Sequence, residues 1–336
     1  MNAAQPKPDR PAPGDLFLSE IREQPDALLR LLEHELEFQT VSRALAERAP
    51  TAVRLVGHGT SDAAATFGTY AFGLLPGWTA LRDTISLTVY YGATFDLSSS
   101  VVIALSQSGR TPDVVDYVQR TRRRGALTVA LTNEPDSELA AAAEATIPLS
   151  AGPERSVAAS KTYLNQLAAL ALLAGGAAGR GREFADALRA VAELLSVALG
   201  PLEQAVSAPA LAFAYVGRMY VIGRGLEFAT AREVALKLTE TCRVAAEPLT
   251  ATDLAHGPVA ALDSLFPVWT IASHDESLPA VIEGAAYVLP VPDPPYPILS
   301  PLLSVVPGQL FAAALARAKG LDPDHPERLT KVTLAR

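Results

Sequence analysis

A carboxylate, an amine and an imidazole lie close together within residues 233–258 of this 336-residue chain. Glu233, Lys237 and Glu240 are spaced i, i+4 and i+7, so a helix would stack them along one face. The apolar residues fall on the other side, which leaves the charged face toward a cleft or water. His256 follows Glu240 by 16 residues, after a turn-rich crossing that ends in His-Gly-Pro. Such groups could transfer protons on a carbonyl compound. On spacing alone, a solvated helix face with ion pairs is the favoured interpretation.

The elements that must position these groups follow an α/β pattern. Short apolar runs alternate with helical patterns, which predicts parallel sheets covered by helices on both faces. A long helical stretch over residues 157–199 closes the first half, and the pattern restarts after Gly200-Pro201. Two strand, Gly-x-Gly, helix openings, at Gly57 and Gly223, suggest a duplicated unit. Strands are expected at residues 53–57, 86–91, 101–105, 127–131 and 146–149, from residue 221, and at 266–272 and 286–291.

Two loops at predicted strand ends carry small polar side chains. They contribute Thr60 and Ser61 after the first strand, and Ser106, Gln107, Ser108 and Thr111 after the third. Thr111 precedes Pro112 and is a good candidate to cap the next helix. A helix N-terminus with free N–H groups favours an anion, and such strand ends converge on one crevice. The alternative is a helix that is merely well capped. Dinucleotide and Walker A patterns are absent, so a phosphate would be carried by the substrate.

Composition excludes several classes of function. A net charge of −8 and a pI near 5.2 argue against a surface for nucleic acid or for anionic membranes. No stretch reaches the roughly 18 apolar residues of a membrane span. Cys242 is the single cysteine, so no intramolecular disulfide can form, and a reducing, cytoplasmic location fits. No His, Asp and Glu set has metal-ligand spacing, and we expect neither a metal nor a cofactor.

Two further features remain open on the residues alone. Residues 156–162 form a third hydroxyl-rich helix start, whose Lys161 could reach the same anion or lie on the surface. His58 follows a predicted strand and could simply bond to a neighbouring backbone group. The Pro-rich residues 1–15 are expected to be a disordered lead-in rather than a signal peptide.

Five segments together resemble the sugar isomerase (SIS) family. They are LSQSGRT (105–111), SVAASKTY (156–163), EVALKLTETCRVAAE (233–247), DLAHGP (253–258) and PERLTKVTL (326–334). The nearest branch looks like the isomerase half of glucosamine-6-phosphate synthase and the stand-alone glucosamine-6-phosphate deaminases. The resemblance implies an α/β fold of two tandem SIS-type domains, each a flavodoxin-like three-layer sandwich. We place them at residues 16–199 and 200–336, the second one shortened. With no glutaminase domain in the sequence, ammonia from glutamine is not expected.

The resemblance also implies a role for each matching position. Ser61, Ser106, Gln107, Ser108 and Thr111 would hold the sugar phosphate, and Val157 and Ala158 would contact the sugar through the backbone. Glu240 would move a proton between C1 and C2 of the open-chain sugar, with Lys237 positioning or polarising its hydroxyls. His256 would assist ring opening from the partner subunit of a homodimer, and Lys331 would form an imine with the ketose.

The expected activity is isomerising deamination of glucosamine 6-phosphate to fructose 6-phosphate and ammonia. Arg110 stands where synthases usually carry an acidic residue, and the 156–161 segment resembles the deaminase pattern more closely. We expect about one helix and one strand of the second half to be missing between Ser273 and Ala286. Three alternatives stay open: another amino-sugar or fructosamine 6-phosphate deglycase, a plain aldose–ketose phosphate isomerase, and a non-catalytic sugar-phosphate sensor.

Overall fold

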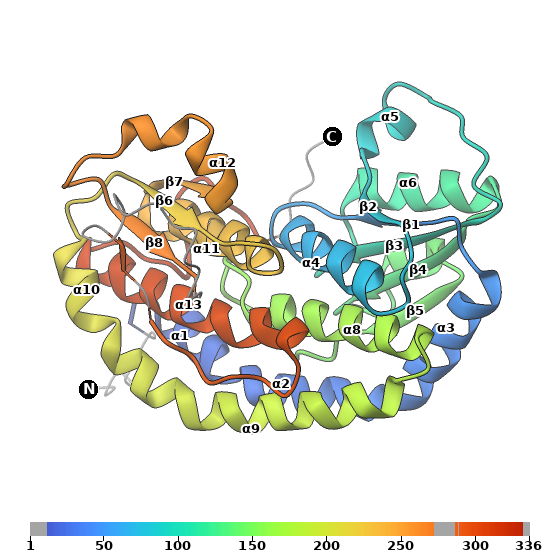
Figure 1. The fold of residues 1–336 in the computed structure, drawn as a ribbon, viewed down its shortest axis with the longest axis horizontal. Coiled ribbons are helices and arrows are strands. Elements are labelled where there is room, and N and C mark those ends of the chain that lie inside the picture. Colours follow the sequence, from blue (N-terminus) through green and yellow to red (C-terminus); the bar gives the residue numbers. More distant parts are fainter. Residues whose placement is uncertain (1–11, 272–285, 288, 332–336) are drawn as a thin grey trace, which may run out of the picture.

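Two parallel β-sheets stand side by side above a layer of long helices (Figure 1). The structure is a computed structural model that describes residues 12–271, 286–287 and 289–331. Of the expected disordered lead over residues 1–15, the first 11 residues lie outside this description, and a helix already begins at Asp15. The stretch in which a helix and a strand were expected to be missing lies outside it up to residue 285.

The first half is a five-stranded parallel sheet with the strand order β2-β1-β3-β4-β5. Its elements are α3 (Glu35–Arg48), β1 (Ala52–Val56), α4 (Thr60–Leu74), β2 (Ala80–Arg82), α5 (Ile85–Val89), β3 (Ser100–Ser106), α6 (Pro112–Arg123), β4 (Leu127–Thr132), α7 (Glu138–Ala142), β5 (Ala145–Pro148) and α8 (Lys161–Ala177). Side chains of the central strand alternate between two hydrophobic layers. Helices α5, α6 and α7 cover one face, and α3, α4 and α8 cover the other, which confirms the three-layer prediction.

The second half is a parallel sheet whose described strands have the order β7-β6-β8-β9. Its elements are α10 (Ser207–Ala212), β6 (Arg218–Ile222), α11 (Glu227–Cys242), β7 (Ala245–Leu249), α12 (Ala251–Ala255), η2 (Pro258–Ala261), β8 (Val268–Thr270), β9 (Ala286–Tyr287), η4 (Pro297–Leu299) and α13 (Ser300–Ala318). Helices α11 and α13 pack on one face, and the short α12 and η2 lie over the other. The two α/β units expected from the sequence are therefore present.

A long helical layer joins the halves along the lower side of the molecule (Figure 1). It consists of α1 (Asp15–Arg22), α2 (Gln24–Leu31), η1 (Leu32–His34) and α9 (Gly181–Ala205). The buried Asp324 carboxylate, from the C-terminal segment, accepts hydrogen bonds from the N–H groups of Gly14, Leu16 and Phe17. Because these N–H groups have no partner within α1, Asp324 caps the helix and ties the two ends of the described chain together.

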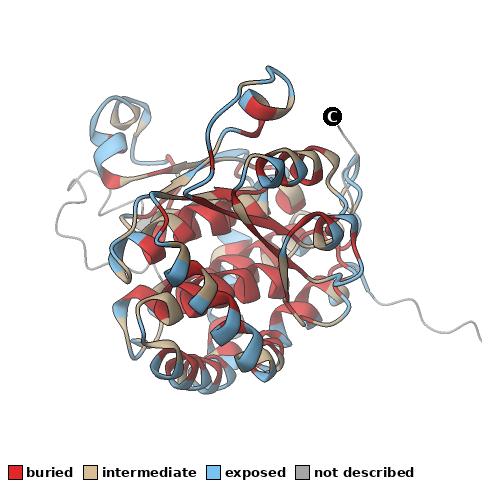
Figure 2. Cartoon of the chain, turned by 90° about the vertical axis from the view of Figure 1, so that its right-hand side faces the viewer, coloured by how far each residue is buried: buried red, intermediate tan, exposed pale blue. Residues whose placement is uncertain are grey.

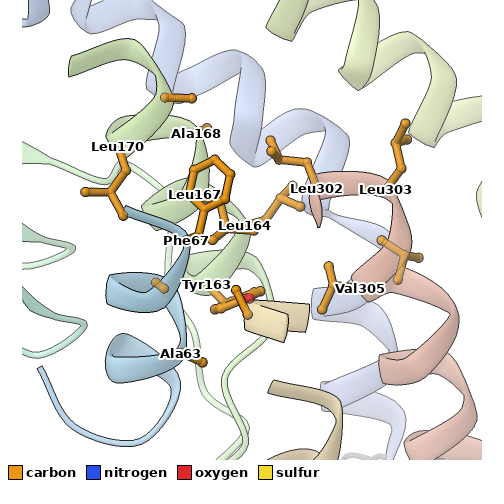
Figure 3. Packing of buried hydrophobic residues seen from close by; sticks show 14 of the residues in the cluster. Ala63, Phe67, Tyr163, Leu164, Leu167, Ala168, Leu170, Leu302, Leu303 and Val305 are labelled. Atoms are coloured by element: carbon orange, nitrogen blue, oxygen red, sulfur yellow. The ribbon is translucent and has the colours of Figure 1, made fainter. Parts of the chain in front are cut away.

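One hydrophobic core runs through both halves instead of two separate ones. In Figure 3, Phe67 of α4 and Leu167 of α8 face Leu302 of α13, so helices from different halves share one packed layer. Figure 2 shows the same arrangement from the side, with buried strands and inner helix faces and exposed outer helix faces. Such continuous packing holds the two sheets in a fixed relation to each other.

Several sequence predictions differ from the structure. Residues 86–91 were predicted as a strand, yet residues 85–89 form helix α5, and the neighbouring strand is β2. Helix α9 continues through Gly200-Pro201, so the predicted break and the domain boundary between residues 199 and 200 both fall inside a helix. The turn-rich crossing after α11 contains strand β7, which pairs with β6.

Two helical stretches, residues 181–212 and 297–318, are long and apolar enough to cross a membrane by length and composition, contrary to the sequence expectation. The apolar window of the second is 89% buried inside the fold, so α13 is a core helix. The buried residues of α9, such as Leu188, Val191 and Leu195, recur at helical spacing on one face. This pattern is that of an amphipathic helix lying on a core.

The contact between α11 and α13 depends on a glycine. A Cβ atom at Gly308 would lie 2.2 Å from a methyl carbon of the buried Val234. We expect Gly308→Ala to lower the free energy of unfolding by about 1–3 kcal/mol, because this β-branched neighbour has little room to move. The matched control is Gly200→Ala in α9, where a Cβ atom meets nothing within 4 Å. The free energy of unfolding of Gly200→Ala should rise by about 0.4–1 kcal/mol, because alanine restricts the unfolded chain more than glycine does. Urea unfolding measures the free energy of unfolding of both variants. Equal changes relative to wild type would contradict the close packing of Gly308 against Val234.

Candidate functional site

The predicted phosphate loops open into one pocket of about 490 Å³. Its walls come from the carboxyl edge of the first sheet, from α11 and from the C-terminal segment. The lining includes Ser61, Ser106, Gln107, Ser108, Thr111, Val157, Lys237, Glu240 and Lys331. Nine of the eleven residues singled out from the sequence thus meet at one place, and Ala158 and His256 do not.

The β3–α6 loop presents hydroxyl groups and backbone N–H groups to this pocket. The Ser106 Oγ accepts a hydrogen bond from the Gly109 N–H at 3.1 Å and lies 3.3 Å from the Thr111 Oγ1. Gly109 has φ +61°, and a Cβ atom there would clash with Ser137, so the tight turn requires glycine. Thr111 holds the N-cap position of α6, but its hydroxyl makes no cap bond, contrary to the prediction. The N-terminus of α6 is consequently left open for an anion.

Ser61 lies in the first turn of α4, beside this loop. Its Oγ accepts a hydrogen bond from the buried Gln166 amide of α8 at 2.9 Å. Because Gln166 donates, the hydroxyl proton of Ser61 is available to a ligand. The β1–α4 and β3–α6 loops therefore converge on one anion-type site, as expected for an open α/β sheet.

The charged face of α11 is largely buried against the first half instead of being open to water, although Lys237 and Glu240 both line the pocket. Glu233 and Lys237 are 0% and 1% exposed, and only Glu240 keeps appreciable exposure, with 24% of its side chain accessible. The Lys237 Nζ lies 2.6 Å from the Glu240 Oε2, 3.2 Å from the Thr60 Oγ1 of α4 and 3.6 Å from the Glu233 Oε1. The ammonium group thus bridges the two halves.

Burial and charge shift the pKa values of this group in defined directions. Burial raises the pKa of Glu233 to about 8, against the opposing effect of Lys237. Burial alone would lower the pKa of Lys237, but the Glu233 and Glu240 carboxylates outweigh it and raise that pKa. The lysine therefore stays protonated next to Glu240. Glu233 serves as a structural partner of Lys237, as the sequence suggested.

Glu154, which the sequence analysis missed, holds the C-terminal lysine at the site. Its buried carboxylate accepts bonds from the N–H groups of Ser160 and Thr162, from the Thr162 hydroxyl and, at 2.9 Å, from the Lys331 Nζ. Burial acts to raise the pKa of Glu154, but Lys331 and the backbone donors lower it overall. A carboxylate six residues before a hydroxyl-rich helix start was the available signal, since acidic groups favour helix N-termini.

The loop before α8 contributes less backbone than expected. Val157 lines the pocket, but its N–H donates to the Asp324 carbonyl at 3.1 Å, so only its carbonyl group remains for a ligand. Ala158 is fully buried and does not line the pocket, whereas Ala159 does. Lys161 neither reaches the anion site nor lies on the surface, since it is buried and paired with Glu23 at 2.5 Å.

The two histidines named from the sequence lie in different places. His256 is exposed at the end of α12 and is not among the lining residues of this chain. His58 lines the pocket, with its Nε2 2.8 Å from the Asp113 Oδ2. Among the described residues no group of three or more His, Cys, Asp or Glu side chains is placed to hold a metal ion.

Comparison with known proteins places this arrangement in a family. The SIS domain model matches residues 50–175 and 213–289. The isomerizing glutamine–fructose-6-phosphate aminotransferase of Aeropyrum pernix is 35% identical over 348 residues, which cover 94% of this chain and 56% of that protein. The chain belongs to the SIS domain family. It spans little more than half the length of this curated relative, and the same holds for the Thermus thermophilus relative, at 58%.

Solved structures show the same SIS fold. The C-terminal domain of glucosamine-fructose-6-phosphate aminotransferase from Francisella tularensis superimposes with a TM-score of 0.83 at 22% identity, covering 95% of this chain and all of that one. Glucosamine-6-phosphate deaminase from Thermotoga maritima gives a TM-score of 0.78 at 21% identity, covering 96% and 100%. At these identities the likeness shows the fold alone.

The pocket of this SIS chain also depends on Glu20 of α1. Its buried carboxyl group accepts hydrogen bonds from the N–H groups of Arg155 and Ser156, next to Val157. Burial is the main reason that the pKa of Glu20 rises from 4.5 to about 7. The folded protein therefore holds a proton there that the unfolded chain has released, and this costs stability increasingly as the pH rises from 4.5 to 7.

We expect Glu20→Gln to remove that cost. The free energy of unfolding should match wild type near pH 4.5 and exceed it by about 1–3 kcal/mol at pH 7.5. Urea unfolding at the two pH values measures the difference, with the exposed Glu193→Gln as the control. A variant that is less stable at pH 7.5 would show that the ionised carboxylate is needed at this position.

Proposed function

We propose that this chain is a hexosamine-6-phosphate isomerase and deaminase that converts glucosamine 6-phosphate and water into fructose 6-phosphate and ammonia. The observation that carries this proposal is the meeting of a phosphate-type loop with a carboxylate–ammonium pair in one pocket of about 490 Å³. Ser106, Ser108 and Thr111 come from the β3–α6 loop, and Glu240 with Lys237 comes from α11. An open-chain sugar phosphate carries its phosphate and its reactive carbons at opposite ends of the molecule, so one ligand can contact both groups.

The phosphate group binds at the N-termini of α4 and α6. Hydroxyl groups of Ser61, Ser106, Ser108 and Thr111 donate to its oxygens, together with backbone N–H groups at the start of α6. This end fixes the substrate without taking part in the reaction. Binding energy from a remote phosphate is then available to orient C1 and C2 against the base.

Glu240 is the base. It removes the proton from C2 of the open-chain aldehyde, giving an enolamine whose C1 carries the hydroxyl group. It then returns a proton to C1, which gives the imine of fructose 6-phosphate. Water adds at C2 and ammonia leaves, so one water is consumed for each ammonia released. The proton moves between adjacent carbons, and a single carboxylate can serve both of them.

The two lysines have different roles in this scheme. Lys237 lies 2.6 Å from the Glu240 Oε2 and keeps that carboxylate oriented toward C2. Lys331 reaches the pocket from the C-terminal segment, where Glu154 holds it. In the proposed scheme Lys331 first passes a proton to solvent, then adds to the C2 carbonyl of the ketose and forms an imine with release of one water; addition of water to this imine returns the free ketose and the amine.

Ring opening is assigned to His256 of a second subunit. In this chain His256 is exposed on α12 and does not line the pocket that holds Glu240. A twofold dimer would let each subunit lend this imidazole to its neighbour's site. The proposed assembly is therefore a homodimer with two composite sites.

Replacement of the base gives the first test. Glu240→Gln should lower kcat for ammonia release from glucosamine 6-phosphate by about a hundredfold to ten-thousandfold, the usual contribution of a general base. It should still bind fructose 6-phosphate, because the phosphate end is unchanged. The exposed Glu247→Gln serves as the control and should keep wild-type activity. Equal activity in Glu240→Gln would remove its assignment as the base.

The substrate panel should include galactosamine 6-phosphate, fructosamine 6-phosphate and phosphorylated aldoses without nitrogen. Isomerisation of the latter without ammonia from any amine would identify a plain aldose–ketose isomerase. Binding of fructose 6-phosphate with no turnover at all would identify a sensor.

Subunit mixing tests the shared site. Glu240→Gln and His256→Ala homodimers should each be inactive, whereas equal mixing after dissociation should restore about a quarter of the wild-type activity. The reason is that half of the dimers are mixed and each mixed dimer holds one intact site. No recovery in a mixture shown by native mass spectrometry to contain mixed dimers would place both groups in one subunit.

A further inference from the structure

The pocket contains a histidine–aspartate pair that the proposed reaction does not use. His58 lies in the β1–α4 loop, and its side chain is 54% exposed toward the pocket that it lines. Its Nε2 is 2.8 Å from the Oδ2 of Asp113, whose side chain is only 9% exposed. The Tyr90 hydroxyl of the α5 region lies 3.5 Å from the same oxygen. With Nε2 occupied by Asp113, the Nδ1 atom of His58 is the one left for a ligand.

This pair stands at the phosphate end of the pocket. Asp113 lies two residues after Thr111, in the first turn of α6, and His58 lies two residues before Thr60 at the start of α4. The N-terminus of α6 is the one left open, whereas the N–H groups of Ser61, Asp62 and Ala63 in α4 already donate to backbone carbonyls. A carboxylate at this place would repel a phosphate dianion by Coulomb interaction unless a cation lay between them.

The other cations lining the pocket are already neutralised. Lys237 is paired with Glu240 and lies close to Glu233, and Lys331 is paired with Glu154. Among the lining residues that the structure describes, Lys237 and Lys331 balance Glu240 and Asp113, so these four sum to zero. A phosphate dianion would thus enter a site with no unpaired lysine or arginine, and His58 is the one side chain there that can add positive charge.

We propose that His58 is a ligand of the substrate phosphate and that binding of the dianion is coupled to uptake of one proton by its imidazole. The inference rests on the proposed function in taking a sugar phosphate as the ligand. The proton comes from solvent. It makes Nδ1 a donor to a phosphate oxygen while Nε2–H donates to Asp113, so Asp113 is a positioning residue that holds the ring. The site then selects the doubly charged phosphate and binds it more tightly at neutral than at alkaline pH.

Isothermal titration of the full chain with fructose 6-phosphate tests this coupling. At pH 7.5 the ligand is mostly a dianion, and runs in two buffers of different ionisation enthalpy give the number of protons taken up. Wild type should take up a measurable fraction of a proton per site. His58→Gln should take up clearly less and should bind about tenfold more weakly at pH 7.0, as expected for loss of a charge-assisted hydrogen bond. That difference in affinity should close by pH 8.5.

Two further variants separate this role from a structural one. His58→Lys carries a fixed charge, so it should keep wild-type or tighter affinity at pH 8.5 without the proton uptake of His58; a structural histidine would not be rescued in this way. The control is His325→Gln, which removes another imidazole that lies near an aspartate, Asp322, outside this pocket. Glu233, behind Lys237, also titrates near pH 8. The proton uptake due to His58 is therefore measured as the difference between wild type and His58→Gln at the same pH, in which the contribution of Glu233 cancels.

The outcomes are distinct. Unchanged affinity and unchanged proton uptake in His58→Gln would overturn the assignment of His58, while fructose 6-phosphate binding would leave the sugar-phosphate pocket standing. Failure of wild type to bind any sugar phosphate would overturn both proposals. Proton-coupled binding that depends on His58, without ammonia release from any amino sugar, would support His58 and remove only the deaminase reaction.

Discussion

A buried ammonium group at the seam between the two halves is the constraint on which the site depends. Lys237 is 1% exposed, and an unpaired charge at such a place would cost several kcal/mol. Its partners come from both sides of the seam, since Glu240 and Glu233 share its own helix and Thr60 belongs to α4. A shift of α11 along α4 would break these contacts and leave the charge uncompensated. The contacts of Lys237 therefore favour a single register of α11 against α4, because any other register would leave a buried charge without a partner.

Polar contacts along the same seam and at the chain ends extend this constraint to the rest of the pocket. Arg232 of α11 bonds to the Asp62 carboxylate at 2.5 Å and to the Thr66 hydroxyl at 2.6 Å, both on α4. At the other wall, Asp324 caps α1 and its carbonyl receives the Val157 N–H, while Glu154 receives Lys331. Segments more than 150 residues apart in sequence thus meet at one pocket. The first half supplies the anion end, and the second half and the C-terminal segment supply the charged groups.

The sequence predicts those parts of the molecule that depend on local pattern. Apolar runs predict the alternating strands and helices, and the residue types near Ser61 and Ser106 predict the two hydroxyl-rich loops. The segments that resemble the family place Glu240 on a helix, which is α11. Errors arise where tertiary packing overrides propensity. Residues 85–89 are rich in β-branched residues, which favour strands, yet they form a helix that packs against α6. Pro248 argues against a strand in the sequence, yet β7 forms there because a strand at the edge of a sheet tolerates proline. The pairs His58–Asp113 and Glu154–Lys331 join residues 55 and 177 positions apart, so no local pattern reveals them.

The helix phase explains why only one of the three charged residues of α11 is suited to act on a substrate. Glu233 and Lys237 point into the seam, where burial raises the pKa of the first and the neighbouring carboxylates raise the pKa of the second. Glu240 lies three residues beyond Lys237, just far enough around the helix to leave the seam and reach the pocket, yet still 2.6 Å from the ammonium. A base at this position is held by its buried neighbour and lines the same pocket as the phosphate-type loop. The spacing of these three residues alone indicates an ordinary charged helix face. The packing of α11 against α4 buries two of them and leaves Glu240 able to contact a ligand.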